Sequence, residues 1–250
     1  MKKIWWFLFI VVFLTPAVLA QDDVYTLKLL AVQENANGTL TGSGADLFLE
    51  LKEGSGRVFL DTFPATKVDT QISTRFAKEI ACHEFRLPCH KYDFIYTIKA
   101  SSNIIGGPSA GAAIAALTTI AVLDLDYNKE DIALTGTINS GGIIGPVGGT
   151  KEKMEAASQL GLKTVLIAKG TAAPWLEAEN DTNATESHFN LTKYAAENLS
   201  LKVIEVSDLD QVLFYLTGKR LNHKNVSVEE NREYSKIMGG LRQLLCQRVE

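Results

Sequence analysis

Two glycine-rich turns place a serine and a lysine where nucleophilic chemistry is possible. Ser109 lies in the segment Gly-Gly-Pro-Ser-Ala-Gly at 106–111, which leads into a long apolar run rich in alanine. Lys151 follows Gly148-Gly149-Thr150 and begins a second, amphipathic helical pattern. A turn that leads into a helix presents unpaired backbone N–H groups and the positive end of the helix dipole. The two residues therefore indicate a serine nucleophile and a lysine general base.

This chemistry requires a lysine that is neutral near pH 7. An ordinary lysine has a pKa of about 10.4 and is almost fully protonated at that pH. Burial in apolar surroundings and the positive end of its helix would lower the pKa of Lys151, so that its amine could take the proton of Ser109. The plainer alternative is a helix-capping serine and a solvated lysine. A lysine in a first helical turn opposes the helix dipole, which favours the functional interpretation.

Hydrophobic periodicity predicts an α/β fold in which helices cover a sheet. We expect strands at residues 24–32, 47–51, 57–60, 92–98, 131–138, 164–168 and 201–206. We expect helices that begin at Asp69, Ala110, Lys151 and Asp208. The helix from Ala110 is apolar almost all round, which predicts that it is buried.

Two shorter patterns refine the first half of the chain. Glu53-Gly54-Ser55-Gly56 suits the turn of a hairpin between the second and third strands. In the helix that Asp69 is expected to cap, the apolar residues Ile72, Phe76 and Ile80 recur every four positions and line one face.

Several segments together resemble the proteolytic domain of Lon proteases in order and spacing. They are Gly107-Pro108-Ser109-Ala110-Gly111, residues 133–138, residues 142–153 with Ala156-Ala157, and residues 161–167. The resemblance covers about 24–218 and is strongest from Gly106 to Lys169. It implies a mixed sheet covered by helices and a Ser-Lys dyad peptidase, with Ser109 as nucleophile, Lys151 as base and Thr135 as the hydroxyl that orients the lysine.

The tetrahedral intermediate of such a reaction needs hydrogen-bond donors for its oxyanion. The backbone around the serine, at Gly107, Pro108 and Ala110, with the N–H of Ser109 itself, is expected to bind it at the helix start. No metal or other cofactor is implied.

Lon proteases usually carry an ATPase module before the protease, and here only the leader and Gln21 to Asp23 precede the domain. The glycine-rich stretch 141–151 also fails the phosphate-loop pattern, because Glu152 follows the lysine. We therefore expect an ATP-independent serine endopeptidase that acts on unfolded proteins or peptides. The alternative is a catalytically silent Lon-like domain that serves as a binding or assembly module. The family resemblance also implies a homo-oligomer, a ring of six.

The first twenty residues have the pattern of an export signal. Met1-Lys2-Lys3 precedes an apolar stretch, Ile4 to Ala20, that ends in a small-residue cleavage site. This stretch is at the lower limit for spanning a bilayer, so an uncleaved membrane anchor is the alternative. In both cases the lysines stay on the cytoplasmic side, and the main domain is expected to be secreted or membrane-anchored outside the cytoplasm.

The cysteines and the glycosylation sequons fit an exported protein. Cys82 and Cys89 are each followed by a histidine, and in an oxidising compartment their spacing favours a disulfide over a zinc site. Cys246 is left to be buried or to pair with another chain. Asn-x-Ser/Thr sequons, either glycosylated or unused, occur at Asn37, Asn180, Asn183, Asn190, Asn198 and Asn225.

The sequence predicts three parts: a leader or anchor at 1–20, the proteolytic domain at 24–218, and a helical appendage at 219–250. The appendage begins with the capping box Ser227 to Glu230 and continues with apolar residues at helical spacing. It either docks on its own domain or contacts a partner. The formal net charge of −4 and the lack of a basic stripe argue against nucleic acid, and the resemblance to Lon proteases implies a polypeptide substrate.

Overall fold

The computed structural model describes residues 24–101, 105–128, 130–172, 175–176, 188–221, 236–240 and 243. The chain divides into two units, 1–220 and 221–250. In the second unit, residues 236–240 are helical. Among the described residues, no helix is long and apolar enough to cross a membrane. The expected leader at 1–20, the capping box at 227–230, Cys246, and the sequons at Asn180, Asn183 and Asn225 lie outside the described residues.

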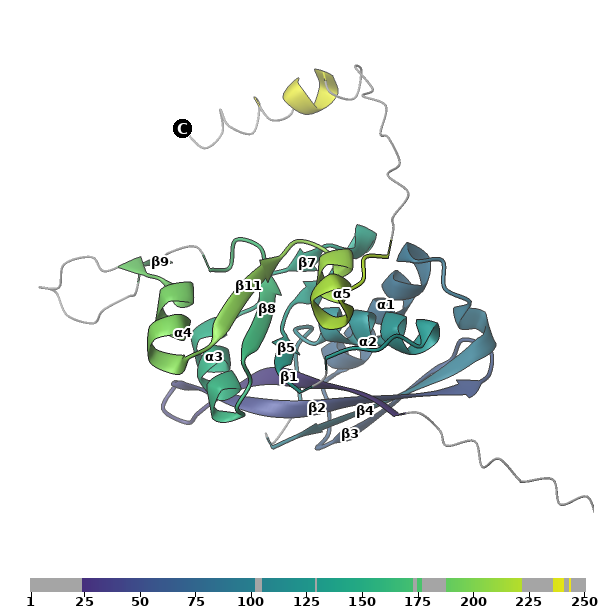
Figure 1. Ribbon diagram of the computed structural model, residues 1–250, viewed down its shortest axis with the longest axis horizontal. Helices are drawn as coiled ribbons and strands as arrows, with labels where there is room; N and C mark the ends of the chain where they lie inside the picture. Colours follow the sequence, from purple (N-terminus) through teal and green to yellow (C-terminus); the bar gives the residue numbers. More distant parts are fainter. Residues whose placement is uncertain are drawn as a thin grey trace, which may run out of the picture. The chain divides into compact units, whose positions relative to one another are not determined.

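A mixed sheet of seven strands forms the centre of the first unit, in the order β11-β8-β5-β1-β2-β4-β3 (Figure 1). The antiparallel pairs are β1 with β2 and β2 with β4, and the other neighbours are parallel. The strand bounds are β1 Val24–Glu34, β2 Leu40–Glu53, β3 Val58–Phe63, β4 Tyr92–Ala100, β5 Ile132–Leu134, β8 Thr164–Ala168 and β11 Lys202–Val206. The mixed α/β class that the sequence predicts is confirmed.

Two small ribbons accompany this sheet. Strand β6 (Thr137–Ile138) pairs with β7 (Ile144–Gly145), and β9 (Trp175–Leu176) pairs with β10 (His188–Phe189). The predicted strand at 131–138 is therefore two short strands, separated by Thr135 and Gly136. This interruption matters because both residues belong to the candidate site.

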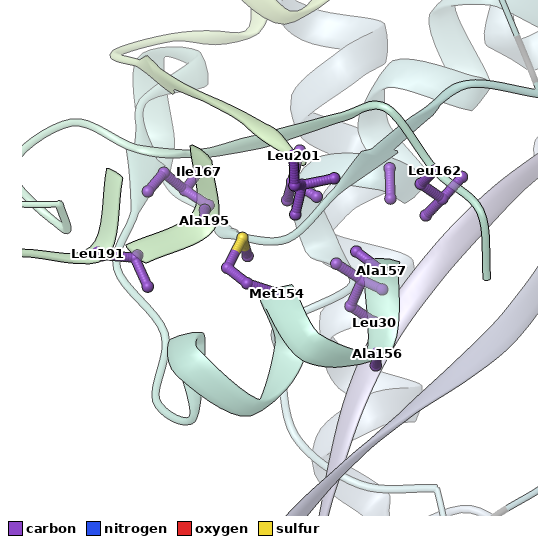
Figure 2. Close-up of a cluster of buried hydrophobic side chains, with 11 residues drawn as sticks. Leu30, Met154, Ala156, Ala157, Leu162, Ile167, Leu191, Ala195 and Leu201 are labelled. Atoms are coloured by element: carbon purple, nitrogen blue, oxygen red, sulfur yellow. The ribbon is translucent and has the colours of Figure 1, made fainter. Parts of the chain in front are cut away.

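One group of helices, α3 (Thr150–Gln159) and α4 (Leu191–Leu199), packs on strands β1, β5, β8 and β11. Figure 2 shows the apolar cluster between them, in which Met154 and Ala157 of α3 meet Leu30 of β1 and Ile167 of β8. Side chains alternate between the two faces of a strand. This cluster therefore uses one face of the sheet, and it fixes α3 against the strands that carry the site.

The second group of helices consists of α1 (Val68–Glu84), α2 (Gly111–Leu123) and α5 (Leu209–Thr217), and α2 contacts both of the others. Helix α2 also packs on β1 and β2, and its residues 111–121 are all buried. Its hydroxyl groups are satisfied inside the helix, since Thr118 and Thr119 donate to carbonyls one turn earlier. The predicted burial of this helix is confirmed.

Helix α1 differs from its sequence-based description. The face lined by Ile72 and Phe76 is exposed, and the buried residues of α1 are Thr70, Thr74, Ala77, Lys78 and Ala81. The apolar repeat thus marks a solvent-facing stripe, while small residues and threonines pack against α2. The helix begins at Val68 with Lys67 at the N-cap position, so Asp69 lies in the first turn and does not cap the helix.

The predicted hairpin between the second and third strands is wrong. Strand β4 lies between β2 and β3 in the sheet, and β3 runs parallel to β4. The turn at 54–57 is held by Asp93 of β4, whose Oδ1 accepts the N–H groups of Ser55 and Arg57. Arg57 pairs with the other oxygen of Asp93 and holds its pKa at about 2, together with the backbone N–H bonds. A long-range ion pair thus shapes the turn.

The disulfide that the sequence favours is present between Cys82 and Cys89. It joins the last turn of α1 to a short 3-10 helix, η1 (Cys89–Lys91), which leads into β4. The three described sequon residues, Asn37, Asn190 and Asn198, are exposed. Asn190 also caps α4, since its side chain accepts the N–H of Lys193.

Candidate active site

Ser109 lies in the turn between β4 and α2, two residues before the first residue of the helix. Gly107 has a φ of +93°, a conformation that residues with a side chain rarely adopt. The turn is closed by a hydrogen bond of 3.0 Å from the N–H of Gly111 to the carbonyl of Pro108. Ser109 is therefore half-buried beside the N-terminus of α2, where the helix dipole favours negative charge.

The segment Thr135-Gly136 anchors the serine turn from the middle of the fold. Gly136 donates its N–H to the carbonyl of Ser109 and accepts the N–H of Ala112, both at 3.0 Å. Thr135 donates its own N–H to the carbonyl of Leu166 in β8. A Cβ atom at Gly136 would lie 2.7 Å from Ile144, so only glycine fits this contact without rearrangement. The nucleophile turn is thus tied directly to the sheet.

Lys153, in the first half of α3, is the buried lysine of this site. It is 2% exposed, and its Nζ donates to Oγ1 of Thr135 at 3.0 Å. Thr135 is itself 1% exposed. Burial disfavours the charged amine and lowers the pKa of Lys153 to about 8. The residue therefore carries a substantial neutral fraction at a mildly alkaline pH.

One pocket contains both Ser109 and Lys153. Its walls come mainly from β1, β2, β4 and the turn before α2, and they are largely apolar. The lining residues are Leu29, Leu30, Ala31, Val32, Ala45, Thr70, Ile98, Ala100, Ile105, Gly106, Gly107, Ser109, Ala110 and Lys153. A serine hydroxyl and a buried amine in an apolar pocket can carry out proton transfer and nucleophilic attack.

The structure does not bring Lys151 to this pocket. Its Nζ lies 5.0 Å from the ring centroid of Phe189 and 5.6 Å from that of Tyr194, on the side of α4. Successive residues of a helix are about 100° apart, so residues two apart lie on nearly opposite faces. The predicted Lys151 is therefore not among the residues that line this pocket, and Lys153 is the lysine that shares it with Ser109.

The helical pattern contained a signal for this choice. Lys153 is followed at i+3 and i+4 by Ala156 and Ala157, which are buried, whereas Lys151 has the polar Glu155 at i+4. Residues three and four apart share a helix face. Lys153 therefore lies in the apolar stripe of α3, and Lys151 lies outside this stripe. This signal is weak, because Met154, three residues after Lys151, is buried as well.

The expected oxyanion donors are also revised. Gly107 donates its N–H to Oδ2 of Asp69 at 3.1 Å, and Pro108 has no N–H group. Within the described part of the chain, the N–H groups of Ser109 and Ala110 have no protein acceptor. Of the three predicted backbone positions, Ala110 is the one that presents an available donor, next to the N–H of Ser109.

A mixed α/β fold with a serine and a buried lysine in one pocket is what the structure shows, and comparison with known proteins relates it to a family of peptidases. The model of the Lon protease (S16) C-terminal proteolytic domain matches residues 96–215. That range includes Ser109, Thr135 and Lys153. Nearly half of the chain is therefore similar to the Lon proteolytic domain.

Individual Lon proteases show the same relationship. The chain is 36% identical to Lon protease of Orientia tsutsugamushi (strain Ikeda) over 125 residues, 50% of this chain and 14% of that protein. It is 31% identical to Lon protease of Campylobacter concisus (strain 13826) over 151 residues, 59% of this chain and 18% of that protein. It is also 31% identical to Lon protease of Roseiflexus castenholzii (strain DSM 13941 / HLO8) over 160 residues, 64% of this chain and 18% of that protein. The chain thus matches less than a fifth of the length of these relatives.

Proposed function

We propose that this domain is a serine endopeptidase in which Ser109 is the nucleophile and Lys153 is the general base. The single observation that carries the proposal is the buried amine of Lys153, whose pKa is about 8, in the same pocket as Ser109. A lysine of this kind exists in part as the free amine near neutral pH, which a solvated lysine does not. No other described group in this pocket has side-chain chemistry suited to accept the proton.

The reaction would proceed in two steps. The neutral amine of Lys153 takes the hydroxyl proton of Ser109 while Oγ bonds to the carbonyl carbon of the peptide substrate. The resulting ammonium gives its proton to the leaving amine, and an ester remains on Ser109. A water molecule then loses a proton to the same amine and attacks the ester, which releases the acid and restores the hydroxyl. At the end of each step the amine of Lys153 is neutral again, as the next step requires.

Thr135 would orient the base in this scheme. Its Oγ1 accepts one N–H of Lys153 at 3.0 Å, which restricts rotation of the amine inside the pocket. The family resemblance assigns the same role to this threonine. We expect Thr135→Val to lower kcat about tenfold, because a freely rotating amine spends less time aligned with the serine hydroxyl. Thr135→Ser, which retains the acceptor oxygen, is the matched control.

The oxyanion would be stabilised by the N–H groups of Ser109 and Ala110 at the start of α2. Both belong to the segment that the N–H of Gly136 holds in place through the Ser109 carbonyl. Backbone donors fixed before reaction contribute more than flexible ones, because they need no reorganisation as charge develops. This arrangement would bind the negative charge of a tetrahedral intermediate.

We propose further that hydrolysis needs no nucleotide and acts on unfolded proteins or peptides. The chemistry above uses no phosphate. The glycine-rich stretch that ends at Lys151 has a structural use here, since it forms a 3-10 turn, β7 and the approach to α3. The proposal also places the domain outside the cytoplasm, secreted or attached through its N-terminal segment. The disulfide between Cys82 and Cys89 supports an oxidising compartment.

The decisive experiment measures cleavage of casein and of a quenched fluorescent peptide without nucleotide, from pH 6 to 10. We expect Ser109→Ala and Lys153→Met to lose activity by at least 10³-fold, as removal of a nucleophile or its base generally does. Lys151→Met is the matched control, because it removes a lysine two positions away on another face of α3 and should stay within threefold of the unmodified protein.

Other outcomes would redirect the proposal. Loss of activity in Lys151→Met together with full activity in Lys153→Met would contradict the assignment of the base. Equal and negligible cleavage by the unmodified protein and the Ser109 variant would support the silent binding or assembly module. Stimulation only by added ATP and a separate unfoldase would remove the nucleotide-independent mode while retaining the dyad.

A further inference from the structure

The segment before the nucleophile is held along its length by the segment that enters α1. Ile105 donates its N–H to the carbonyl of Ala65 at 3.1 Å, and its carbonyl accepts the N–H of Lys67 at 2.9 Å. These bonds form a parallel bridge between Thr66 and Ile105. The side chain of Thr66 adds a third contact, since its Oγ1 donates to the same carbonyl at 3.1 Å. The turn that carries Ser109 therefore starts from a fixed edge.

A continued parallel ladder would next pair the N–H of Gly107 with the carbonyl of Lys67. That carbonyl instead accepts the N–H of Gln71, because α1 begins at Val68. The start of the helix thus removes the backbone acceptor that Gly107 would have used. The carboxylate of Asp69 replaces it, and its Oδ2 accepts the Gly107 N–H at 3.1 Å.

Asp69 is well placed for this substitution because it also bonds to its own helix. Its Oδ1 accepts the N–H of Thr70 at 2.7 Å, so the two carboxylate oxygens bridge α1 and the nucleophile turn. Thr70 bonds the next peptide group of the turn, since its Oγ1 donates to the carbonyl of Gly107 at 3.4 Å. Thr70 is 1% exposed and lines the pocket that contains Ser109.

We propose that Asp69 is a positioning residue for catalysis, which holds the Gly107 peptide so that Ser109 and its N–H group face the substrate pocket. This inference rests on the proposed peptidase activity and adds a residue from α1 to its machinery. The carboxylate touches neither the substrate nor the reacting atoms. It acts through Gly107, whose φ of +93° leaves the peptide orientation dependent on its hydrogen bonds.

The test compares Asp69→Ala, Asp69→Asn and the control Asp61→Ala, which removes an exposed carboxylate from β3. For Asp69→Ala we expect kcat to fall about tenfold and KM for the peptide to stay within twofold, because binding walls are intact while the nucleophile is misplaced. The rate at which a fluorophosphonate labels Ser109 should fall by a similar factor. Asparagine keeps one acceptor oxygen, so Asp69→Asn should recover part of both rates. The control should match the unmodified protein.

Hydrogen exchange of the peptide that covers residues 105–111 gives a measurement independent of turnover. We expect its exchange to be about tenfold faster in Asp69→Ala than in the unmodified protein, while the melting temperatures stay close. Unchanged kcat and unchanged exchange in Asp69→Ala would overturn the inference. So would a loss of kcat that Asp69→Asn does not recover at all. Failure of the peptidase proposal is distinct, since the unmodified protein would then show no cleavage and no labelling.

Discussion

Lys153 combines two properties that rarely occur together, a charged side-chain type and nearly complete burial. Its neighbours on α3 are Met154, Ala156 and Ala157, all buried in the cluster shown in Figure 2. A buried amine is destabilised mainly in its charged form, because the protein interior solvates charge poorly. Burial of Lys153 therefore lowers the stability of the folded domain and, for the same reason, leaves part of its amine neutral near pH 7.

The pH dependence of hydrolysis should follow the titration of this residue. With a pKa of about 8, Lys153 is neutral in about a tenth of molecules at pH 7 and in most of them above pH 9. We expect kcat/KM to rise about tenfold between pH 7 and 9 and then level off. A pH series with a peptide substrate measures this directly. A rate that keeps rising in proportion to hydroxide up to pH 10.5 would contradict a depressed lysine pKa.

Replacement of Lys153 by methionine should abolish activity and stabilise the fold near neutral pH. The folded-state pKa of about 8 lies below the ordinary 10.5, so the unfolded chain binds more protons between these values. The free energy of unfolding of the unmodified protein therefore rises with pH between about 8 and 10.5. Below pH 8, burial of the charged amine lowers this free energy by its full amount, about 3 kcal/mol. The Lys153→Met variant buries no charged amine. It loses the hydrogen bond between Lys153 and the Thr135 hydroxyl, which lowers the free energy of unfolding by about 1 kcal/mol.

We therefore expect the free energy of unfolding of Lys153→Met to exceed that of the unmodified protein by about 2 kcal/mol at pH 7, and this difference should decrease toward pH 10.5. Urea unfolding at pH 7, 8.5 and 10 measures both quantities. Lys151→Met serves as the comparison and should show no such pH-dependent gain. A variant that is less stable than the unmodified protein at pH 7 would show that the amine of Lys153 stabilises the fold.

At the scale of elements, α3 reaches the site because it packs very closely on β2. A Cβ atom on Gly42 would lie 1.9 Å from the carbonyl oxygen of Glu152, in the residue just before Lys153. Gly149, directly before α3, has a φ of +64°, and a Cβ atom there would lie 2.6 Å from Cγ1 of Val32 in β1. The two glycines thus allow α3 to pack close to the sheet, and this packing determines the position of Lys153.

Gly42→Ala should therefore both destabilise the domain and impair the site. The added methyl group meets backbone rather than a movable side chain, so α3 must shift, at a cost of about 3 kcal/mol. We expect urea unfolding to show this loss and kcat at pH 9 to fall by at least tenfold. Gly148→Ala is the matched control, since a Cβ there has no neighbour within 4 Å. Equal stability of the two variants would show that α3 is not closely seated.

At the scale of the whole molecule, the exposed stripe of α1 is the feature that the isolated chain leaves unexplained. Val68, Ile72 and Phe76 are 67%, 63% and 42% exposed, at positions four residues apart. Ile72 and Phe76 also line a second pocket with Pro108 and Gly111, on either side of Ser109 in the sequence. A contiguous apolar stripe on a surface helix is typical of a protein contact. We propose a second copy of this chain as the partner.

We expect the full chain to sediment as an oligomer, and Ile72→Lys with Phe76→Lys to shift it toward the monomer. The charged side chains would have to be buried in the contact, which weakens association at least a hundredfold. Ile143→Lys, a change at another exposed isoleucine, should leave the sedimentation coefficient unchanged. An oligomer that persists in the double variant would place the contact elsewhere. A monomeric unmodified protein would remove the oligomer prediction.

Much of the domain could be predicted from local sequence. The strands at 24–32, 92–98 and 164–168, the buried helix after Ser109 and the helix that begins near Lys151 all lie where their patterns indicate. Patterns of this kind work because burial and backbone geometry are repeated at short sequence distances. The glycine turn around Ser109 is similarly local, and so is the nearby pair of cysteines that forms the disulfide.

The tertiary structure alone decided the features that depend on contacts between distant segments. These contacts place β4 between β2 and β3, turn the apolar side of α1 toward solvent, and bring Asp69 to Gly107. They also select Lys153 over Lys151, since the two lysines have similar sequence surroundings and differ in which face of α3 meets Thr135. The sequence by itself indicated the two segments that supply the candidate site, the glycine turn before α2 and the first part of α3. Packing determined which lysine, because only burial makes its amine a base.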